Sequence, residues 1–266
     1  IIQNIFSIIF NKIGDFMATG RGFTLAEVLI TLGIIGIVAA MTIPTVATRI
    51  THKKLQSQFK KTYAELNQAT RAFYADTDIP VHDYDVLIKS GVDTSWNSNA
   101  LLEKFMSYYK GFSKTSGDSW GSFDNLHNIK NLNLNGTVIN QYPCDQSRVY
   151  FDNVGRLYVM DDTSTAYVKP LPYGPKICVD INGIDKPNRW GYDRFVFVFT
   201  EENAVIPYTG REWNRLASNQ TEPREIAKFC NKKQGSVQHA CAYFALSDQS
   251  PTGNGSYWYD FLIRNK

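Results

Sequence analysis

The carboxylate of Glu27 lies at the start of an apolar stretch. No charged residue occurs between Glu27 and Pro44, and the flanking residues 23–26 are mostly apolar. This stretch is slightly shorter than the ~20 residues of a full membrane span, but its flanks extend it enough to cross a bilayer. A carboxylate in such a helix is costly in lipid and therefore indicates function. Glu27 is the first candidate functional residue.

A secretory signal peptide is the alternative explanation for this stretch. Its cleavage site would follow the apolar core as a small-x-small pattern, and VAA at 38–40 is the nearest match. However, an amphipathic helix pattern continues directly after the apolar stretch, and a signal peptide has no use for a carboxylate at Glu27. A membrane-embedded helix accounts better for both observations.

Residues 22–27 read GFTLAE and are followed directly by the apolar stretch. This pattern resembles the prepilin peptidase recognition motif of type IV pilins and type II secretion pseudopilins, and the resemblance extends over residues 22–75. It implies cleavage between Gly22 and Phe23, followed by N-methylation of the new amine of Phe23. It also implies that Glu27, the fifth residue of the mature chain, assists assembly, and that Pro44, the 22nd, kinks the helix.

Elementary chemistry supports these roles. Gly22 has no side chain, so a peptidase can approach its backbone closely. Cleavage exposes a cationic amine in an apolar setting, where the Glu27 carboxylate of a neighbouring subunit can neutralise it and select the register. Pro44 lacks a backbone donor and can bend or locally melt the helix. Gly33 and Gly36 allow close helix packing.

Three segments follow from this interpretation. Residues 1–22 form the leader, and because Met17 begins a short basic leader of the expected kind, we expect 1–16 to be an upstream extension or a misassigned start. Residues 23–75 form the membrane and assembly helix. Residues 76–266 form an exported globular head, long enough to bury a core.

The charge of the chain is concentrated after the apolar stretch. The formal net charge is +3, and the head has 20 basic and 22 acidic residues. Residues 44–75 contain one acid, Glu65, and six basic residues: Arg49, Lys53, Lys54, Lys60, Lys61 and Arg71. A solvated helix face explains this excess, and attraction of anionic lipid or DNA is the alternative. The near-neutral head argues against a nucleic-acid partner.

The four cysteines lie in the second half of the chain. They form no C-x-x-C pattern, so they do not suggest zinc. Export favours two disulfides, for which three pairings exist. We expect Cys230 with Cys241, which would close a short loop, and Cys144 with Cys178.

Clustered oxygen ligands suggest a possible calcium loop. Some pseudopilins bind calcium in a head loop, so the resemblance points the same way. The spacing is not that of an EF-hand, and Asn-Gly and Pro-Asn are common turn formers, so an ordinary turn is the alternative. The candidate ligands are Asp180, Asn182, Asp185, Asn188 and Asp193.

A short nucleophile-elbow pattern, G-x-S-x-G, occurs at 117–121. A hydrolase elbow needs a buried strand before the serine and a helix after it, and the flanking sequence has loop composition. The four histidines are scattered along the chain, and we expect them on the surface. We therefore expect no enzyme activity and no required cofactor.

The remaining pattern predicts an α+β fold, in which a long N-terminal helix packs on an antiparallel sheet. The helix stripe consists of Leu55, Phe59, Tyr63, Leu66, Ala69 and Phe73. A second helix is predicted at 99–110, a loop at 113–135, a turn at 152–155 and a helical segment at 223–232. Strands are predicted at 137–141, 148–151, 157–160, 166–168, 177–181, 194–200, 204–207 and 257–263.

These observations favour a pilin-like structural subunit, with a head large enough to suggest a minor one. Its expected partners are other pilin-like subunits, the prepilin peptidase, the assembly machinery and the membrane before assembly. Its expected location is the bacterial inner membrane, with the head exported and the mature chain entering a fibre. The main alternative is a membrane-anchored exported binding protein, such as an adhesin or a DNA-capture head.

Overall fold

The structure is a computed structural model. It describes residues 23–84, 98–109, 112–114, 119–145, 147–161, 173–209, 223–233 and 238–264. The chain divides into two compact units, Ile1–Ile50 and Thr51–Lys266. The long predicted helix, α2, spans Leu25–Thr77, so the boundary between the units falls within it.

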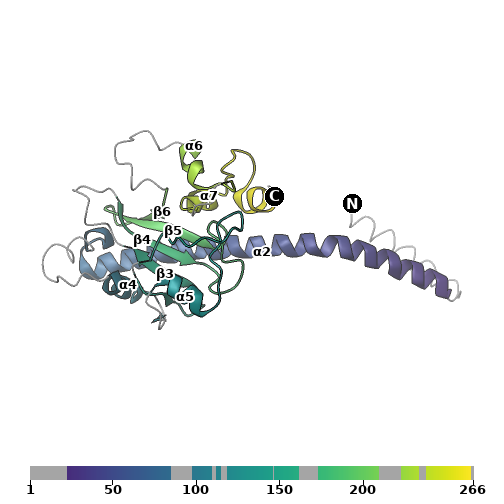
Figure 1. The fold of residues 1–266 in the computed structure, drawn as a ribbon, viewed down its shortest axis with the longest axis horizontal. Coiled ribbons are helices and arrows are strands. Elements are labelled where there is room, and N and C mark those ends of the chain that lie inside the picture. Colours follow the sequence, from purple (N-terminus) through teal and green to yellow (C-terminus); the bar gives the residue numbers. More distant parts are fainter. Residues whose placement is uncertain are drawn as a thin grey trace. The chain divides into compact units, whose positions relative to one another are not determined.

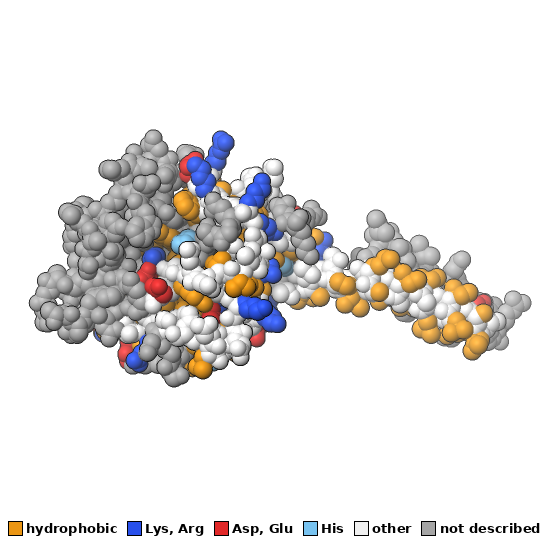
Figure 2. Space-filling view, in the orientation of Figure 1, with side chains coloured by type: hydrophobic (Ala, Val, Ile, Leu, Met, Phe, Trp, Pro, Cys, Tyr) orange, Lys and Arg blue, Asp and Glu red, His pale blue; other side chains and the backbone are white. Residues whose placement is uncertain are grey.

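The first unit contains the apolar half of α2. Its large side chains, such as Leu29, Ile35 and Met41, are exposed, and Figure 2 shows hydrophobic side chains along the visible face of this segment. An 18-residue window of α2 has a mean hydropathy of 2.2 and is not buried, so by length and composition the helix can cross a membrane. Apolar side chains on every face are typical of a helix that lies in lipid or among other helices.

The head is built around a six-stranded antiparallel sheet (Figure 1). The strands follow one another in space in their chain order, as a meander. The strands are β1 (Ser113–Lys114), β2 (Tyr150–Phe151), β3 (Leu157–Asp161), β4 (Tyr173–Asp180), β5 (Arg194–Thr200) and β6 (Val205–Pro207). A turn joins β2 to β3, where Gly155 N donates to Asp152 O at 3.0 Å, as predicted for 152–155.

Strand β5 is buried along its whole length. Its odd-numbered residues, Phe195, Phe197 and Phe199, belong to the hydrophobic cluster that includes α2. Its even-numbered residues, Val196 and Val198, belong to a second cluster. Because successive side chains of a strand point to opposite faces, the sheet is covered by apolar packing on both sides.

The head half of α2 packs on the first of these faces. Phe59 is fully buried, and its ring lies 4.6 Å from that of Phe195 and 5.6 Å from that of Trp258, centroid to centroid. The predicted stripe is confirmed, since all of its members except the partly buried Tyr63 are buried. Burying a side chain such as Phe59 contributes about 1.5–3 kcal/mol. The α+β fold is therefore the one that the sequence predicted.

Short helices surround the sheet. They are α4 (Ser98–Met106), α5 (Trp120–Leu126), α6 (Pro223–Ile226), η1 (Ala227–Phe229), α7 (Cys241–Ser247) and η2 (Tyr257–Arg264). The helix predicted at 99–110 corresponds to α4, and the segment predicted at 223–232 corresponds to α6 and η1. The strands at 148–151, 157–160, 177–181, 194–200 and 204–207 correspond to β2–β6, and the strand predicted at 166–168 lies outside the described residues.

Three local predictions were wrong. The segment predicted as a loop at 113–135 contains α5, whose Trp120 and Phe123 are buried one turn apart. The strand predicted at 137–141 forms only an isolated bridge at Val138, because the Asn133 and Asn135 side chains accept hydrogen bonds from Thr137 N at 3.1 and 2.9 Å.

The strand predicted at 257–263 is instead the π-helix η2. Tyr257, Trp258, Phe261 and Leu262 are buried, which is a helical rather than an alternating pattern. Trp258 Nε1 donates to Ala245 O at 2.9 Å, so the indole N–H is satisfied against α7. A short apolar run does not distinguish a strand from a helix, and tertiary packing decides here.

Both predicted disulfides are present. Cys144 is bonded to Cys178 of β4, and Cys230 is bonded to Cys241 at the start of α7. The second bond closes the short loop that follows η1. These bonds suit a domain that is exported to an oxidising compartment.

Candidate functional site: the processing and assembly segment

The predicted cleavage site lies at the edge of what the structure describes. Gly22 is outside the described residues, and Phe23 is the first described residue, with its side chain about half exposed. The helix begins two residues later, at Leu25. The scissile bond that the motif implies would therefore immediately precede the start of α2.

Thr24 and Glu27 cap the start of α2 reciprocally. Glu27 Oε2 accepts hydrogen bonds from Thr24 N at 2.9 Å and from Thr24 Oγ1 at 2.8 Å. Glu27 N donates in turn to Thr24 Oγ1 at 3.3 Å. This is a capping box, which satisfies backbone donors that the first turn of a helix leaves unpaired. Glu27 therefore has a structural role in the single chain.

The capping box leaves half of the carboxylate unused. Within the described part of the chain, Glu27 Oε1 accepts no hydrogen bond. A carboxylate has about four lone-pair sites, so Glu27 can hold the Thr24 cap and still accept a bond from a cationic donor. The arrangement keeps the side chain at the first turn of the helix, where the amine of a neighbouring chain could bind to it.

Thr24 is the site residue that the sequence reasoning missed. Its signal was present, because a threonine followed three residues later by glutamate, just before an apolar run, marks a helix start. The peptidase motif that overlaps this signal points to Glu27 alone. The structure shows that the two residues act as a pair.

Helix α2 continues through Pro44 without interruption. Proline has no N–H, so the helix lacks the hydrogen bond that Pro44 would donate to the carbonyl of Ala40. Thr48 Oγ1 donates to Pro44 O at 2.8 Å, and Thr42 Oγ1 donates to Val38 O at 2.9 Å. The helix is therefore not melted at Pro44 in this single chain, and the kink or melting that the resemblance implies stays a prediction for the assembled fibre.

The proposed calcium ligands lie around one loop, but most of their oxygens already accept hydrogen bonds. Asp193 accepts from Asn188 N at 2.8 Å and from Arg189 N at 2.6 Å. Asp180 Oδ2 accepts from Arg194 Nε at 2.9 Å. Asp180 and Asp193 are fully buried.

The other proposed ligands stabilise the same loop. Asn182 Nδ2 donates to Asp185 O at 3.1 Å and to Lys186 O at 3.2 Å, whereas Asn182 Oδ1 is buried without a partner. In the described segments no group of three or more His, Cys, Asp or Glu side chains is arranged to hold a metal ion. Because calcium takes six to eight oxygens, this geometry favours the turn alternative.

Arg194 provides the positive charge at this cluster. Its guanidinium also pairs with Asp124 at 2.8 Å and lies 4.9 Å from the ring of Trp120. Burial raises the pKa of Asp180 well above its usual value, with the neighbouring Asp193 adding to the rise, and burial raises the pKa of Asp193 to about 6. The sequence did not predict that a buried arginine would hold this network together.

Only Ser119, Trp120 and Gly121 of the nucleophile-elbow pattern lie in the described part of the chain. Ser119 precedes α5 as its N-cap, and its Oγ accepts a hydrogen bond from Ser122 N at 3.3 Å. Residues 115–118 lie outside the described part of the chain. Two of the histidines expected on the surface, His52 and His82, are buried. The ring of His52, on α2, lies 5.2 Å from that of Tyr192, centroid to centroid.

Comparison with known proteins bears on the N-terminal segment. A family model described as the prokaryotic N-terminal methylation motif matches residues 17–43. The matched segment includes the capping box and the first part of the exposed apolar helix, so the chain has a prepilin-type N-terminal motif followed by an α+β head. The matched motif is the cleavage and methylation signal of type IV pilins and pseudopilins, and it points to a structural subunit rather than an enzyme. No curated protein and no solved structure matches the chain significantly.

Proposed function

We propose that the chain is a structural subunit of a type IV pilus or a type II secretion pseudopilus. The prepilin peptidase cleaves it between Gly22 and Phe23, and the Phe23 amine is N-methylated. The mature subunit resides in the inner membrane with its head exported. The assembly machinery then extracts it from the membrane into a fibre of pilin-like subunits. The size of the head favours a minor subunit.

The observation that carries this proposal is the carboxylate of Glu27 at the first turn of an exposed apolar helix. The Thr24 cap orients the carboxylate through Oε2, and Oε1 remains available. The methylated amine of a neighbouring Phe23 is the cation that this position suits. Where water is scarce, such a pair selects one register of helix packing over its neighbours.

Processing tests the proposal directly. Co-expression with a prepilin peptidase should give a mature chain whose first residue is methylated Phe23, as read by mass spectrometry of the intact protein. Gly22→Leu is the matched control, because it blocks approach of the peptidase and should leave the leader in place. Cleavage near residues 38–40 would instead identify a signal peptide and overturn the proposal.

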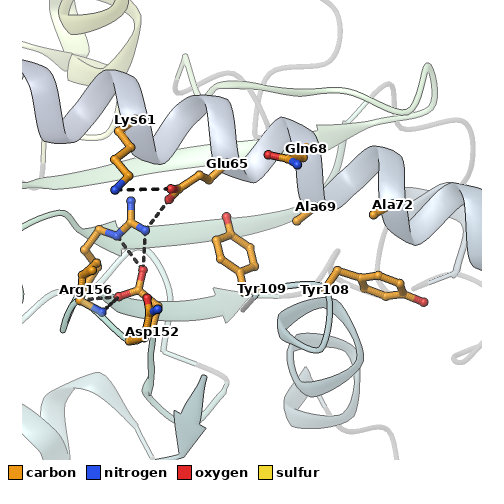
Figure 3. Close-up of a pocket in the computed structure, with 11 residues that line it drawn as sticks. Lys61, Glu65, Gln68, Ala69, Ala72, Tyr108, Tyr109, Asp152 and Arg156 are labelled. Carbon is orange, nitrogen blue, oxygen red and sulfur yellow. Dashed lines mark hydrogen bonds and ion pairs between the residues drawn. The ribbon is translucent and has the colours of Figure 1, made fainter. Parts of the chain in front are cut away.

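A second candidate function is a membrane-anchored exported binding protein. The observation that favours it is a cavity of about 390 Å³ in the head, lined by both charged and apolar side chains (Figure 3), which a purely structural subunit does not need. The two functions are compatible, since a fibre subunit can carry a binding head. DNA capture is the weaker form of this candidate because the head is close to neutral overall.

A further inference from the structure

The head carries a group of basic side chains at the end where α2 enters it, among the first residues of the second unit. Tyr192 links the elements that meet there. Its ring lies 5.2 Å from that of His52 on α2, centroid to centroid, and the centroid lies 5.8 Å from the guanidinium carbon of Arg189. Tyr192 Oη and Lys232 Nζ donate to the same acceptor, Leu262 O, at 3.1 and 3.2 Å. The loop between β4 and β5, the segment after η1 and the helix η2 therefore meet α2 at this end.

Five basic residues make up this group, which we call the basic rim: Lys53, Lys54, Lys186, Arg189 and Lys232. Lys53 and Lys54 directly follow His52 along α2, and both are exposed. Lys186 is exposed on the same loop as Arg189, which is partly exposed. Within the described chain, the first four of the five form no ion pair. Most of the charge of the basic rim is therefore not neutralised by the head itself.

Acidic side chains also lie at this end, but among the described residues fewer of them are accessible. Asp248 and Asp260 are partly exposed, and each accepts a hydrogen bond from a nearby N–H group, at 3.1 and 2.9 Å. Asp185 is exposed beside Lys186. The buried carboxylates beneath the same loop are bound by Arg194 and by backbone amides. The accessible charge at this end is therefore mainly positive, which suits an anionic partner.

The connectivity of the chain places the basic rim close to the membrane surface whenever α2 spans the membrane. No charged residue occurs from Val28 to Thr48, and Lys53 follows Thr48 by five residues. Five residues span about 7.5 Å in a helix and at most about 18 Å in an extended chain. The headgroup layer on each side of the hydrocarbon core is about 5–8 Å thick, and the field of an anionic leaflet extends about 8 Å beyond it. The basic rim therefore begins within reach of lipid headgroups.

We propose that the basic rim binds the headgroups of anionic phospholipids on the membrane face to which the head is exported. This inference rests on the proposed function, because it requires α2 to lie in the membrane, and it adds a partner for the head. Lipid is favoured over nucleic acid because the anchored helix brings lipid to the basic rim in every copy of the subunit. The contact holds the head against the bilayer until the subunit is extracted.

The test uses the mature full-length chain in nanodiscs of phosphatidylcholine, with or without phosphatidylglycerol. A trace of gadolinium-chelating lipid in both kinds of disc broadens the NMR signals of amides that lie near the headgroups. The amides of Gly191 and Tyr192 report on the basic rim, and those of Thr77 and Asp78, at the far end of α2, are the internal control. Phosphatidylglycerol should increase the broadening at Gly191 and Tyr192 by about fivefold, the ratio expected for one basic residue at an anionic surface. High salt should reverse the increase, and the control amides should not respond.

Charge variants identify the residues responsible. Lys54→Gln combined with Lys186→Gln removes two exposed charges of the basic rim and should return the broadening at Gly191 to its value in phosphatidylcholine. Arg71→Gln combined with Lys104→Gln removes two exposed charges far along α2 and beside its end, and should behave like the wild type. Replacing the two lysines of the basic rim by arginine should also preserve the effect. Equal Tm values for the variants and the wild type show that the head remains folded.

The outcomes separate this inference from the proposed function. A mature chain that does not enter nanodiscs overturns the membrane location and both proposals with it. A chain that enters the discs but shows equal broadening with and without phosphatidylglycerol, or equal losses in the two double glutamine variants, overturns the lipid contact alone. Retention of a DNA duplex by the chain in phosphatidylcholine discs, lost in the variant of the basic rim and without any response to phosphatidylglycerol, would assign the basic rim to nucleic acid instead.

Discussion

Arg194 binds the carboxylate of Asp124 through two parallel hydrogen bonds, from Nη1 to Oδ2 at 2.8 Å and from Nη2 to Oδ1 at 2.9 Å. Neither residue is more than 1% exposed. The pair joins β5 to α5 across the second hydrophobic cluster, and Tyr142 Oη donates to the same carboxylate at 3.0 Å. A bidentate pair of this kind fixes geometry as well as charge.

The first prediction is that Arg194→Leu strongly destabilises the head. It leaves the carboxylates of Asp124 and Asp180 buried without their cation, and breaking one side of a buried pair costs about 3–5 kcal/mol. The free energy of unfolding from urea titration measures the loss. Arg224→Leu is the control: this arginine is exposed on α6, so its loss should stay within about 0.5 kcal/mol. Equal small losses in the two variants would contradict the role of Arg194.

Calcium should not stabilise this region. If residues 180–193 formed a calcium site, added Ca²⁺ would raise the Tm of the head by mass action. We predict no shift between EDTA and millimolar Ca²⁺, because Arg194 and backbone amides already occupy the carboxylates of Asp180 and Asp193. A calcium-dependent rise in Tm that disappears in Asp185→Ala would show instead that the loop binds the ion.

The stability of the head should fall in mild acid through His239. Burial, with a smaller effect of the nearby Lys176 charge, lowers the pKa of His239 from 6.5 to about 4. The unfolded chain therefore binds a proton at this residue below pH about 6.5, whereas the folded chain binds that proton only below pH about 4. The stabilisation that comes from burying neutral His239 is fully present above pH 6.5. It is lost as the pH falls from 6.5 toward 4, which lowers the free energy of unfolding by about 2–3 kcal/mol.

His239→Gln tests this dependence by difference. Carboxylates elsewhere also titrate in this range, so the informative quantity is the wild-type free energy of unfolding minus that of the variant, measured from pH 7 to pH 4. The variant should lose less stability than the wild type over this interval. Parallel curves for the two proteins would mean that His239 titrates alike in the folded and unfolded chains.

Some of the fold was predictable because local pattern and tertiary packing agree. The stripe from Leu55 to Phe73 has a helical period, and the run at 194–200 has a strand period, so each pattern specifies one element. The turn at 152–155 was predictable from its own residues, because it needs the positive φ of +86° that Gly155 adopts there and that glycine tolerates. The disulfides followed from export and from the short spacing between Cys230 and Cys241.

Other features depend on partners far away in the sequence. The run at 257–263 suits a strand or a helix, and the contacts of Trp258 with Phe59 and Ala245 select the helix. Arg194 begins a strand like any polar flanking residue, and only the folded chain brings it to Asp124, which lies 70 residues earlier. Residues that are distant in sequence but close in space leave no local pattern to detect.

The disulfide between Cys230 and Cys241 should contribute substantially to stability. It closes a loop with a sequence separation of 11, which in the chain-entropy model corresponds to about 3 kcal/mol. A variant with both cysteines replaced by serine should lose about that much free energy of unfolding. A thiol assay on unreduced protein from the cell envelope should detect no free thiol, and four free thiols would refute both pairings.

Glu27 is predicted to have two separable roles, in capping the helix and in pairing with a neighbouring amine. Glu27→Gln keeps an acceptor for the Thr24 cap but removes the charge. Glu27→Ala removes both. If the charge serves assembly, both variants should be cleaved normally, because the peptidase acts at Gly22, and both should enter fibres poorly. An unpaired Phe23 amine in an apolar fibre core would cost about 3–5 kcal/mol.

The most direct measurement is the ratio of processed subunit in sheared fibres to processed subunit in membranes, for Glu27→Gln expressed beside the wild type. Thr24→Val is the matched control, because it removes the cap and keeps the charge. We predict that Glu27→Gln accumulates in the membrane at least tenfold over the wild type, the ratio that corresponds to about 1.4 kcal/mol, whereas Thr24→Val still enters fibres. Equal incorporation of Glu27→Gln and the wild type would contradict the assembly role of Glu27.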